Sequence, residues 1–348
     1  MKKSLLALAV LGAFAGAAVA QSSVTIYGKL DLGLVKANDG ASILTGGPSN
    51  DELQLAQQAG SRLGFRGTED LGGGLRANFG FEHRFTPDNG AADSTFWQGF
   101  SWVGLSGGFG ELRLGRDYSP YFWTNIAADP WGYDTVGQIG MVHTASAVAV
   151  VSRYSNLISY RTPNLSGLTA QVAVGLAEQT NDTKDNVGFN VEYRGGPLYV
   201  GFGFHQGDSA AGMTGLATAL GTTPAALGIV AGDKGTSMGI TASYNFGVAR
   251  LIGAYSTAKA EATTAGDDYS ANNWSLAVSA PVGGGDLRAM YTRLTGKDLL
   301  DGIKNTKFGL GYHYPLSKRT KVYADIGSAK TTSLDRRTAY DFGIQHNF

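Results

Sequence analysis

VTIYGKLDLGLV, residues 24–35, alternates between apolar and polar residues. A β-strand points successive side chains to opposite faces, so this alternation predicts a strand with one apolar face and one polar face. The apolar face carries Val24, Ile26, Leu30, Leu32 and Leu34. The polar face carries Thr25, Tyr27, Lys29 and Asp31. Such a strand suits a soluble sandwich or a barrel embedded in a membrane.

The same alternation recurs along the whole chain. We count about sixteen such segments, an even number within the range of outer-membrane barrels. The expected strands are 24–35, 62–68, 75–84, 95–105, 111–115, 153–162, 168–176, 187–193, 198–205, 238–246, 249–256, 274–280, 287–292, 308–314, 322–327 and 338–348.

The connections between these segments fall into two kinds. Short, glycine-rich turns follow every second strand, and the connections between them are mostly longer and polar. The longer connections are 36–60, 85–94, 116–151, 177–185, 207–236 and 258–271. Short turns on one rim and long loops on the other are typical of outer-membrane barrels, whereas a sandwich has no reason to sort its loops. The sequence therefore predicts an all-β, sixteen-stranded antiparallel transmembrane barrel.

Residues 1–20, MKKSLLALAVLGAFAGAAVA, have the pattern of a secretory signal peptide. Two lysines precede a short apolar run, and Ala18-Val19-Ala20 forms a small-x-small cleavage site. The run is shorter than the ~20 apolar residues of a spanning helix. We therefore expect an exported chain in which residues 21–348 form one barrel.

The composition narrows the possible partners and functions. Two of the 28 basic residues lie in the signal segment, which leaves 28 − 2 = 26 basic residues and 28 acidic residues in the exported chain. The net charge of the exported chain is therefore close to zero. This balance gives no argument for a nucleic-acid partner. The chain contains no cysteine, so it has no disulfides. The five histidines have no metal-ligand spacing, and we expect no metal and no cofactor.

One long segment, residues 116–151, lacks the alternation found elsewhere. It reads RDYSPYFWTNIAADPWGYDTVGQIGMVHTASAVAVV, with aromatic residues near its start and small residues near its end. Long loops in compact proteins are often functional. We expect this segment to determine what the protein does.

Several motifs resemble the general diffusion porins of the Gram-negative outer membrane, and the resemblance covers the whole chain. These motifs are SVTIYGKLD (23–31), SRLGFRGTEDLGGG (61–74), WVGLSGGFG (102–110), LGR (114–116), YPLSKRT (314–320) and the terminal Phe348. The resemblance implies a homotrimer of barrels, each with its third external loop folded into the lumen as a constriction. That loop would be residues 116–151. The implied function is passive diffusion of ions and small hydrophilic solutes.

The expected constriction combines residues from the strands and from the loop. Arg62 and Arg153 resemble arginines that line the constriction in this family, and alternation places Glu82, Arg84 and Asp325 on the lumen face. Asp117, Asp129 and Asp134 are candidates for an acidic rim opposite the arginines. Fixed charges in a narrow pore select ions electrostatically. The sequence leaves the sign of the selectivity, the size cutoff and the physiological solute open.

Outer-membrane barrels can also serve as enzymes, selective channels or receptors. An enzyme needs paired nucleophile and base groups on adjacent strands, and we identify none, so we expect no enzymatic activity. A substrate-selective channel, or an adhesin or receptor that works through its loops, remains an alternative. The expected partners are outer-membrane lipid, lipopolysaccharide and the outer-membrane insertion machinery.

Phe348 gives a prediction about assembly. Phe342, Ile344, His346 and Phe348 share one face of the last strand, which we expect to meet lipid or a neighbouring subunit, with Phe348 read by the insertion machinery. Deletion of Phe348 should lower the yield of assembled protein in the outer membrane, measured at ordinary expression levels. A normal yield of trimer from the truncated gene would contradict this.

Overall fold

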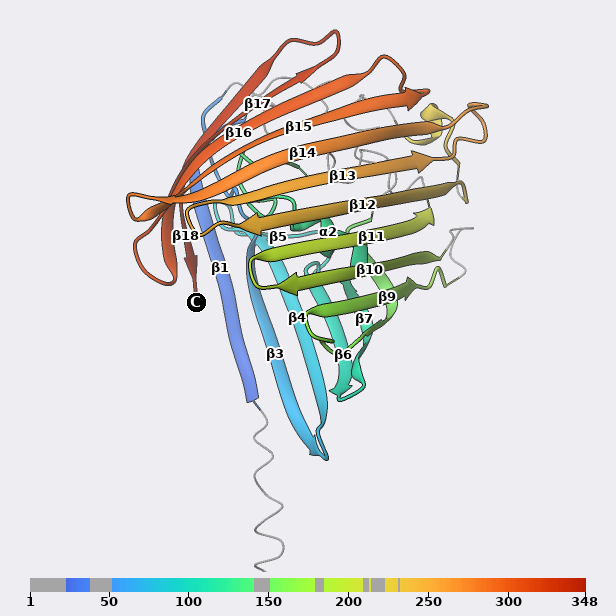
Figure 1. The fold of residues 1–348 in the computed structure, drawn as a ribbon, viewed down its shortest axis with the longest axis vertical. Helices are drawn as coiled ribbons and strands as arrows, with labels where there is room; N and C mark the ends of the chain where they lie inside the picture. Colours follow the sequence, from blue (N-terminus) through green and yellow to red (C-terminus); the bar gives the residue numbers. More distant parts are fainter. Residues whose placement is uncertain are drawn as a thin grey trace, which may run out of the picture.

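The computed structural model describes residues 23–37, 52–140, 151–178, 185–208, 213, 223–230 and 232–348, and Figure 1 shows the fold. The expected signal peptide, residues 1–20, lies outside the described residues. Within the described ranges, no helix is long and apolar enough to cross a membrane.

Sixteen long strands in the described part of the chain form one closed antiparallel sheet. Neighbours along the chain pair with each other, and β18 closes the barrel on β1, from Lys29 opposite Asn347 to Lys36 opposite Tyr340. The expected sixteen-stranded barrel is confirmed. The strands are β1 (Ser23–Lys36), β3 (Ser61–Gly72), β4 (Leu75–Thr86), β6 (Phe100–Gly107), β7 (Gly110–Tyr118), β8 (Arg153–Arg161), β9 (Leu168–Gly175), β10 (Asn186–Gly195), β11 (Leu198–Asp208), β12 (Lys234–Asn245), β13 (Arg250–Ala260), β14 (Tyr269–Val282), β15 (Gly285–Asp298), β16 (Lys304–Pro315), β17 (Thr320–Thr331) and β18 (Arg337–Asn347). The loops carry the short elements β2 (Gln54–Ala56), β5 (Ala91–Ala92), α2 (Pro120–Ile126) and η1 (Ala225–Leu227).

The barrel is apolar outside and largely polar inside. In β1, Val24 is 66% exposed on the outer face, whereas the inward Asp31 is 1% exposed. The inner faces of other strands bury polar residues such as Asn190 and Thr292. A soluble protein would bury the apolar face instead, so this arrangement is typical of a barrel that spans a membrane.

Several expected strand limits need correction. The strand expected at 95–105 begins at Phe100, because the preceding residues fold over the outer face and place the Trp97 ring 4.7 Å from the Phe81 ring. Strands β14 and β15 extend beyond the expected 274–280 and 287–292. Their backbone pairing continues where the apolar alternation has already ended, which sequence periodicity cannot detect.

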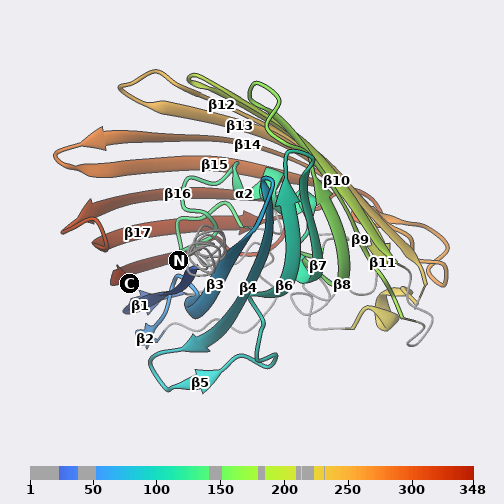
Figure 2. The same cartoon turned by 90° about the horizontal axis from the view of Figure 1, so that it is seen from below.

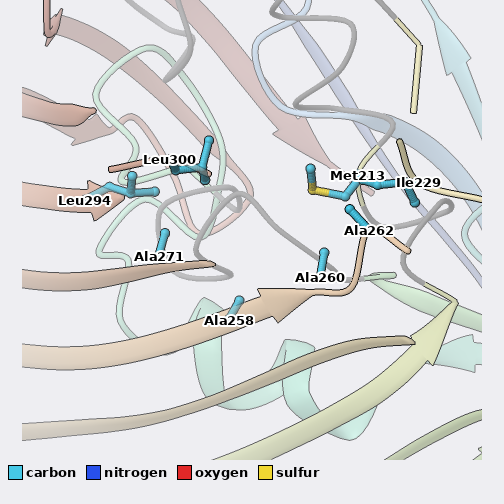
Figure 3. Close-up of a cluster of buried hydrophobic side chains, with 8 residues drawn as sticks. All are labelled: Met213, Ile229, Ala258, Ala260, Ala262, Ala271, Leu294 and Leu300. Atoms are coloured by element: carbon cyan, nitrogen blue, oxygen red, sulfur yellow. The ribbon is translucent and has the colours of Figure 1, made fainter. Parts of the chain in front are cut away.

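A small apolar cluster lies at the loop end of β13–β15, in contrast to the polar lumen (Figure 3). Its members are Met213, Ile229, Ala258, Ala260, Ala262, Ala271, Leu294 and Leu300. The residues from the β11–β12 connection are held there by Asp233, whose carboxylate accepts hydrogen bonds from the N–H groups of Val230 (2.9 Å) and Thr263 (3.2 Å). The described residues around Ile229 are thereby fixed to the barrel rim.

The connection between β7 and β8 behaves differently, because its described part lies within the ring of strands (Figure 2). Small residues on the inner wall make room for it. A Cβ atom at Gly203 of β11 would lie 2.9 Å from the Tyr121 ring of α2. A Cβ atom at Gly309 of β16 would overlap the carbonyl oxygen of Gly137. The absence of side chains at Gly203 and Gly309 therefore lets this segment pack closely on the wall near Tyr121 and near Gly137.

Substitution of Gly309 tests this seating. Gly309→Ala should displace residues near Gly137 and change the single-channel conductance, because the clash is with backbone that cannot rotate away. Gly253→Ala is the matched control, since a Cβ there meets only a Leu276 methyl at 3.6 Å. Both variants should assemble, because the paired strands do not depend on the loop. Equal conductance of the two variants would show that the loop does not rest on Gly309.

Candidate functional site

The first part of the inserted connection is the helix α2, which packs on the inner wall at β10–β12. Ser119 caps the helix, and its Oγ accepts a hydrogen bond from the Phe122 N–H at 3.2 Å. Tyr121 is fully buried against the wall. The side-chain amide of Asn190 in β10 donates to the carbonyl of Pro120 at 2.8 Å. The position of α2 is therefore set by both packing and hydrogen bonds.

The following residues cross to the opposite wall at β17, β18 and β1. The indole N–H of Trp131 donates to Asp325 of β17 at 2.6 Å, and the Val136 N–H donates to Asp341 of β18 at 2.9 Å. Val136 also packs with Val35 of β1 in a small buried apolar group. The segment is thus attached at both walls and divides the lumen.

The space left beside this segment is a cavity of about 550 Å³. The barrel contributes residues of β1, β3, β4, β6 and β8, and the loop contributes its aromatic and acidic side chains. The lining residues are Lys29, Gly60, Arg62, Glu82, Arg84, Phe100, Tyr118, Phe122, Trp123, Ile126, Gly132, Tyr133, Asp134, Gln138, Ser152 and Arg153.

Ion pairs neutralise part of the charge in this cavity. Glu82 lies 2.6 Å from Arg84 and 3.9 Å from Arg62. Lys29 pairs with Asp134 of the loop at 3.0 Å. The cavity lining holds four cationic side chains and two carboxylates, so positive charge is in excess.

Tyr118, the last residue of β7, brings two of the arginines together. Its hydroxyl accepts hydrogen bonds from Arg84 at 3.0 Å and from Arg153 at 2.5 Å. Nearby, Arg116 donates to Ser155 (2.7 Å) and to Gln98 (3.3 Å). Two guanidinium groups therefore converge on the Tyr118 hydroxyl with a third nearby, which raises the local positive potential.

A second cavity of about 300 Å³ adjoins the first and shares Phe100, Tyr118 and Trp123 with it. Its charge is more balanced. Arg113 pairs with Asp117 at 2.8 Å and with Glu111 at 3.0 Å. The excess of positive charge is therefore concentrated in the first cavity.

The expected site residues divide into two groups. Arg62, Glu82, Arg84, Asp134 and Arg153 all line the first cavity. Asp117, Asp129 and Asp325 do not.

Each of these three aspartates has partners elsewhere. Asp117 faces the second cavity beside Arg113. Asp129 turns back on its own loop, where its carboxylate accepts the N–H groups of Trp131 (3.0 Å) and Tyr133 (2.9 Å). Asp325 is on the inner face as expected, but Trp131 covers it. Of the expected acidic rim, Asp117, Asp129 and Asp134, Asp134 alone lines the first cavity.

Lys29 and Tyr118 belong to the site but were not among the expected residues. Alternation in β1 had already placed Lys29 on the polar face, so the signal for it was present. Tyr118 gives no comparable signal, because its role depends on arginines from distant strands.

Comparisons with known proteins agree on one family. The family model described as Gram-negative porin matches residues 7–334. Outer membrane porin protein 32 of Delftia acidovorans is 38% identical over 360 residues, which cover 99% of this chain and 95% of that protein. An outer membrane porin protein of Bordetella pertussis is 32% identical over the full length of both chains. The solved anion-selective porin from Comamonas acidovorans aligns with a TM-score of 0.78 and 31% identity, covering 94% of this chain and 100% of that one.

The burial of Asp129 gives a prediction about pH. Asp129 lies in the loop, and its burial raises the pKa of its carboxyl from 3.8 to about 6. The docked loop therefore favours the protonated acid, so docking is most stable below about pH 4 and loses about 3 kcal/mol as the pH rises through 6. Amide hydrogen exchange of residues 119–140, corrected for intrinsic rates, should be slower at pH 4 than at pH 7.5.

Asp129→Asn should weaken this dependence, because an amide does not ionise in this range. The exposed Asp88→Asn is the control and should keep it. Equal protection of the wild-type loop at both pH values would contradict the expectation.

Proposed function

Because the chain belongs to the Gram-negative porin family, we propose that residues 116–151 form the constriction of its channel and that this constriction prefers anions. The protein is an outer-membrane porin, whose water-filled barrel allows passive diffusion. Family and fold indicate a channel rather than an enzyme.

The single observation that carries the anion preference is the charge of the first cavity. Among the described residues that line it, Lys29, Arg62, Arg84 and Arg153 outnumber the two carboxylates, Glu82 and Asp134. At physiological ionic strength, charges are screened over about 8 Å, so they act on a passing ion only where the walls are close. The docked loop brings the walls together at these residues. The similar porin from Comamonas acidovorans is anion-selective, which supports this proposal.

We further propose that the protein is exported by the signal peptide of residues 1–20 and works as a homotrimer. Stacked aromatic rings on the outer face support a contact with another subunit, with 5.1 Å between the Phe65 and Phe81 centroids and 5.9 Å between those of Phe79 and Phe81. The remaining apolar outer surface would meet outer-membrane lipid and lipopolysaccharide. Phe348, 44% exposed at the end of the closing strand, is accessible to the insertion machinery.

Neutralising two cavity arginines tests the anion preference. The double variant Arg62→Gln/Arg153→Gln should shift the reversal potential toward cations in a planar bilayer under a KCl gradient. The shift should be larger near 0.1 M than near 1 M mean salt, because the screening length falls from about 10 Å to about 3 Å. The strand pairing is untouched, so assembly should be preserved.

Arg76→Gln is the matched control. Arg76 shares the inward parity of Arg84 on β4 but lies about 26 Å closer to the turn and outside the cavity. It should leave the reversal potential nearly unchanged. If the double variant matched this control at both salt concentrations, Arg62 and Arg153 would not be part of the selectivity site.

A further inference from the structure

The loop presents an aromatic surface to the positively charged cavity. Helical spacing turns Tyr121, Thr124 and Asn125 toward the barrel wall, where all three are buried. Trp123 points the other way and is 39% exposed, lining both cavities. Apolar surface left in water is unfavourable. The indole of Trp123 therefore offers apolar contact area to a solute in either cavity.

The aromatic surface is held rigid by its own contacts. Tyr118 stacks on Phe122 with 4.3 Å between ring centroids, and its centroid lies 5.1 Å from that of Trp123. Phe122 also meets Tyr133 edge to face at 5.9 Å. Because these rings fix one another, a flat solute can bind without first ordering the side chains.

Two arginines near this surface, Arg153 and Arg116, lack carboxylate partners among the described residues. Arg153 lies 4.1 Å from the Tyr118 ring centroid, and its hydrogen bonds go to the Gly99 carbonyl and to hydroxyl groups. Arg116 donates to Ser155 and Gln98. Among the described residues, neither arginine has an ion pair with an acidic side chain. A solute carboxylate could supply the ion pair that these arginines do not form with the described acidic side chains.

We propose that this site binds aromatic carboxylates during passage, with the carboxylate at Arg153 and the ring against Trp123. The inference rests on the proposed function, since it adds a solute class to the same constriction. A carboxylate forms strong charge-assisted hydrogen bonds with guanidinium groups, and an aromatic ring gains from offset or edge contacts with other rings. An inorganic anion satisfies only the first requirement, and a neutral aromatic compound only the second.

The second cavity offers a route by which a bound solute can leave the first cavity. Trp123 and Tyr118 line both cavities, so a bound ring can move from one to the other while keeping an aromatic contact. There, Arg113 lies 4.0 Å from the Trp102 ring but is already paired with Asp117 and Glu111. The carboxylate is held less strongly at this position. Binding at entry and weaker binding at exit are what conduction through a selective pore requires.

The test compares two anions of equal charge and similar size, benzoate and cyclohexanecarboxylate. Their permeabilities relative to chloride are obtained from reversal potentials in planar bilayers at millimolar concentration. Wild-type channels should pass benzoate in preference to its saturated analogue. Trp123→Leu should reduce the benzoate-to-cyclohexanecarboxylate ratio about fivefold, which is the scale of one aromatic contact. Trp123→Tyr should keep most of it.

Trp97→Leu is the matched control, because Trp97 packs on Phe81 outside the lumen. It should leave the ratio unchanged. A wild-type ratio near one, or a ratio that Trp123→Leu leaves intact, would overturn the aromatic site. Reversal potentials in KCl, measured in the same membranes, separate this from failure of the proposed anion preference, which would appear as cation selectivity of the wild type.

Discussion

The backbone pairing that closes β18 on β1 is the constraint on which the rest of the molecule depends. Within a bilayer no water is available to satisfy an open strand edge, so a sheet can cross only as a closed ring. Closure turns the usual arrangement of a protein inside out, with Val24 exposed to the membrane side and Asp31 buried on the lumen side. Because the ring of hydrogen bonds holds the barrel together, the lumen side chains are not needed for its stability and can be charged residues that act on the solute.

The second determinant is the polar attachment of the inserted loop. Hydrogen bonds from Asn190 to Pro120 and from Trp131 to Asp325 fix two parts of it against different walls. Without this attachment, the basic residues of the wall would face a wide aqueous lumen, where salt screens their field. With it, the same residues face an aromatic surface at close range. Fold and selectivity are therefore linked through a few buried hydrogen bonds.

Sequence alternation predicted much of this structure. A period of two assigns each strand residue to a face, and Glu82 and Arg84 line the cavity as expected. Alternation does not indicate how far along the lumen a residue lies or which other residues cover it. Asp325 is therefore on the expected face but lies beneath Trp131, a residue 194 positions away. The loop has no period at all. The carboxyl of Asp129 could not be distinguished from that of Asp134, although one caps a turn and the other meets Lys29.

The most direct measurement is to locate an anion in the channel. Crystals grown with bromide in place of chloride would give an anomalous difference map in which bromide is identified without ambiguity. A peak is expected beside Arg84 and Arg153, close to the Tyr118 hydroxyl, where guanidinium groups converge. Bromide found only in the wide parts of the lumen, with none at these arginines, would contradict an anion-selective constriction at this loop.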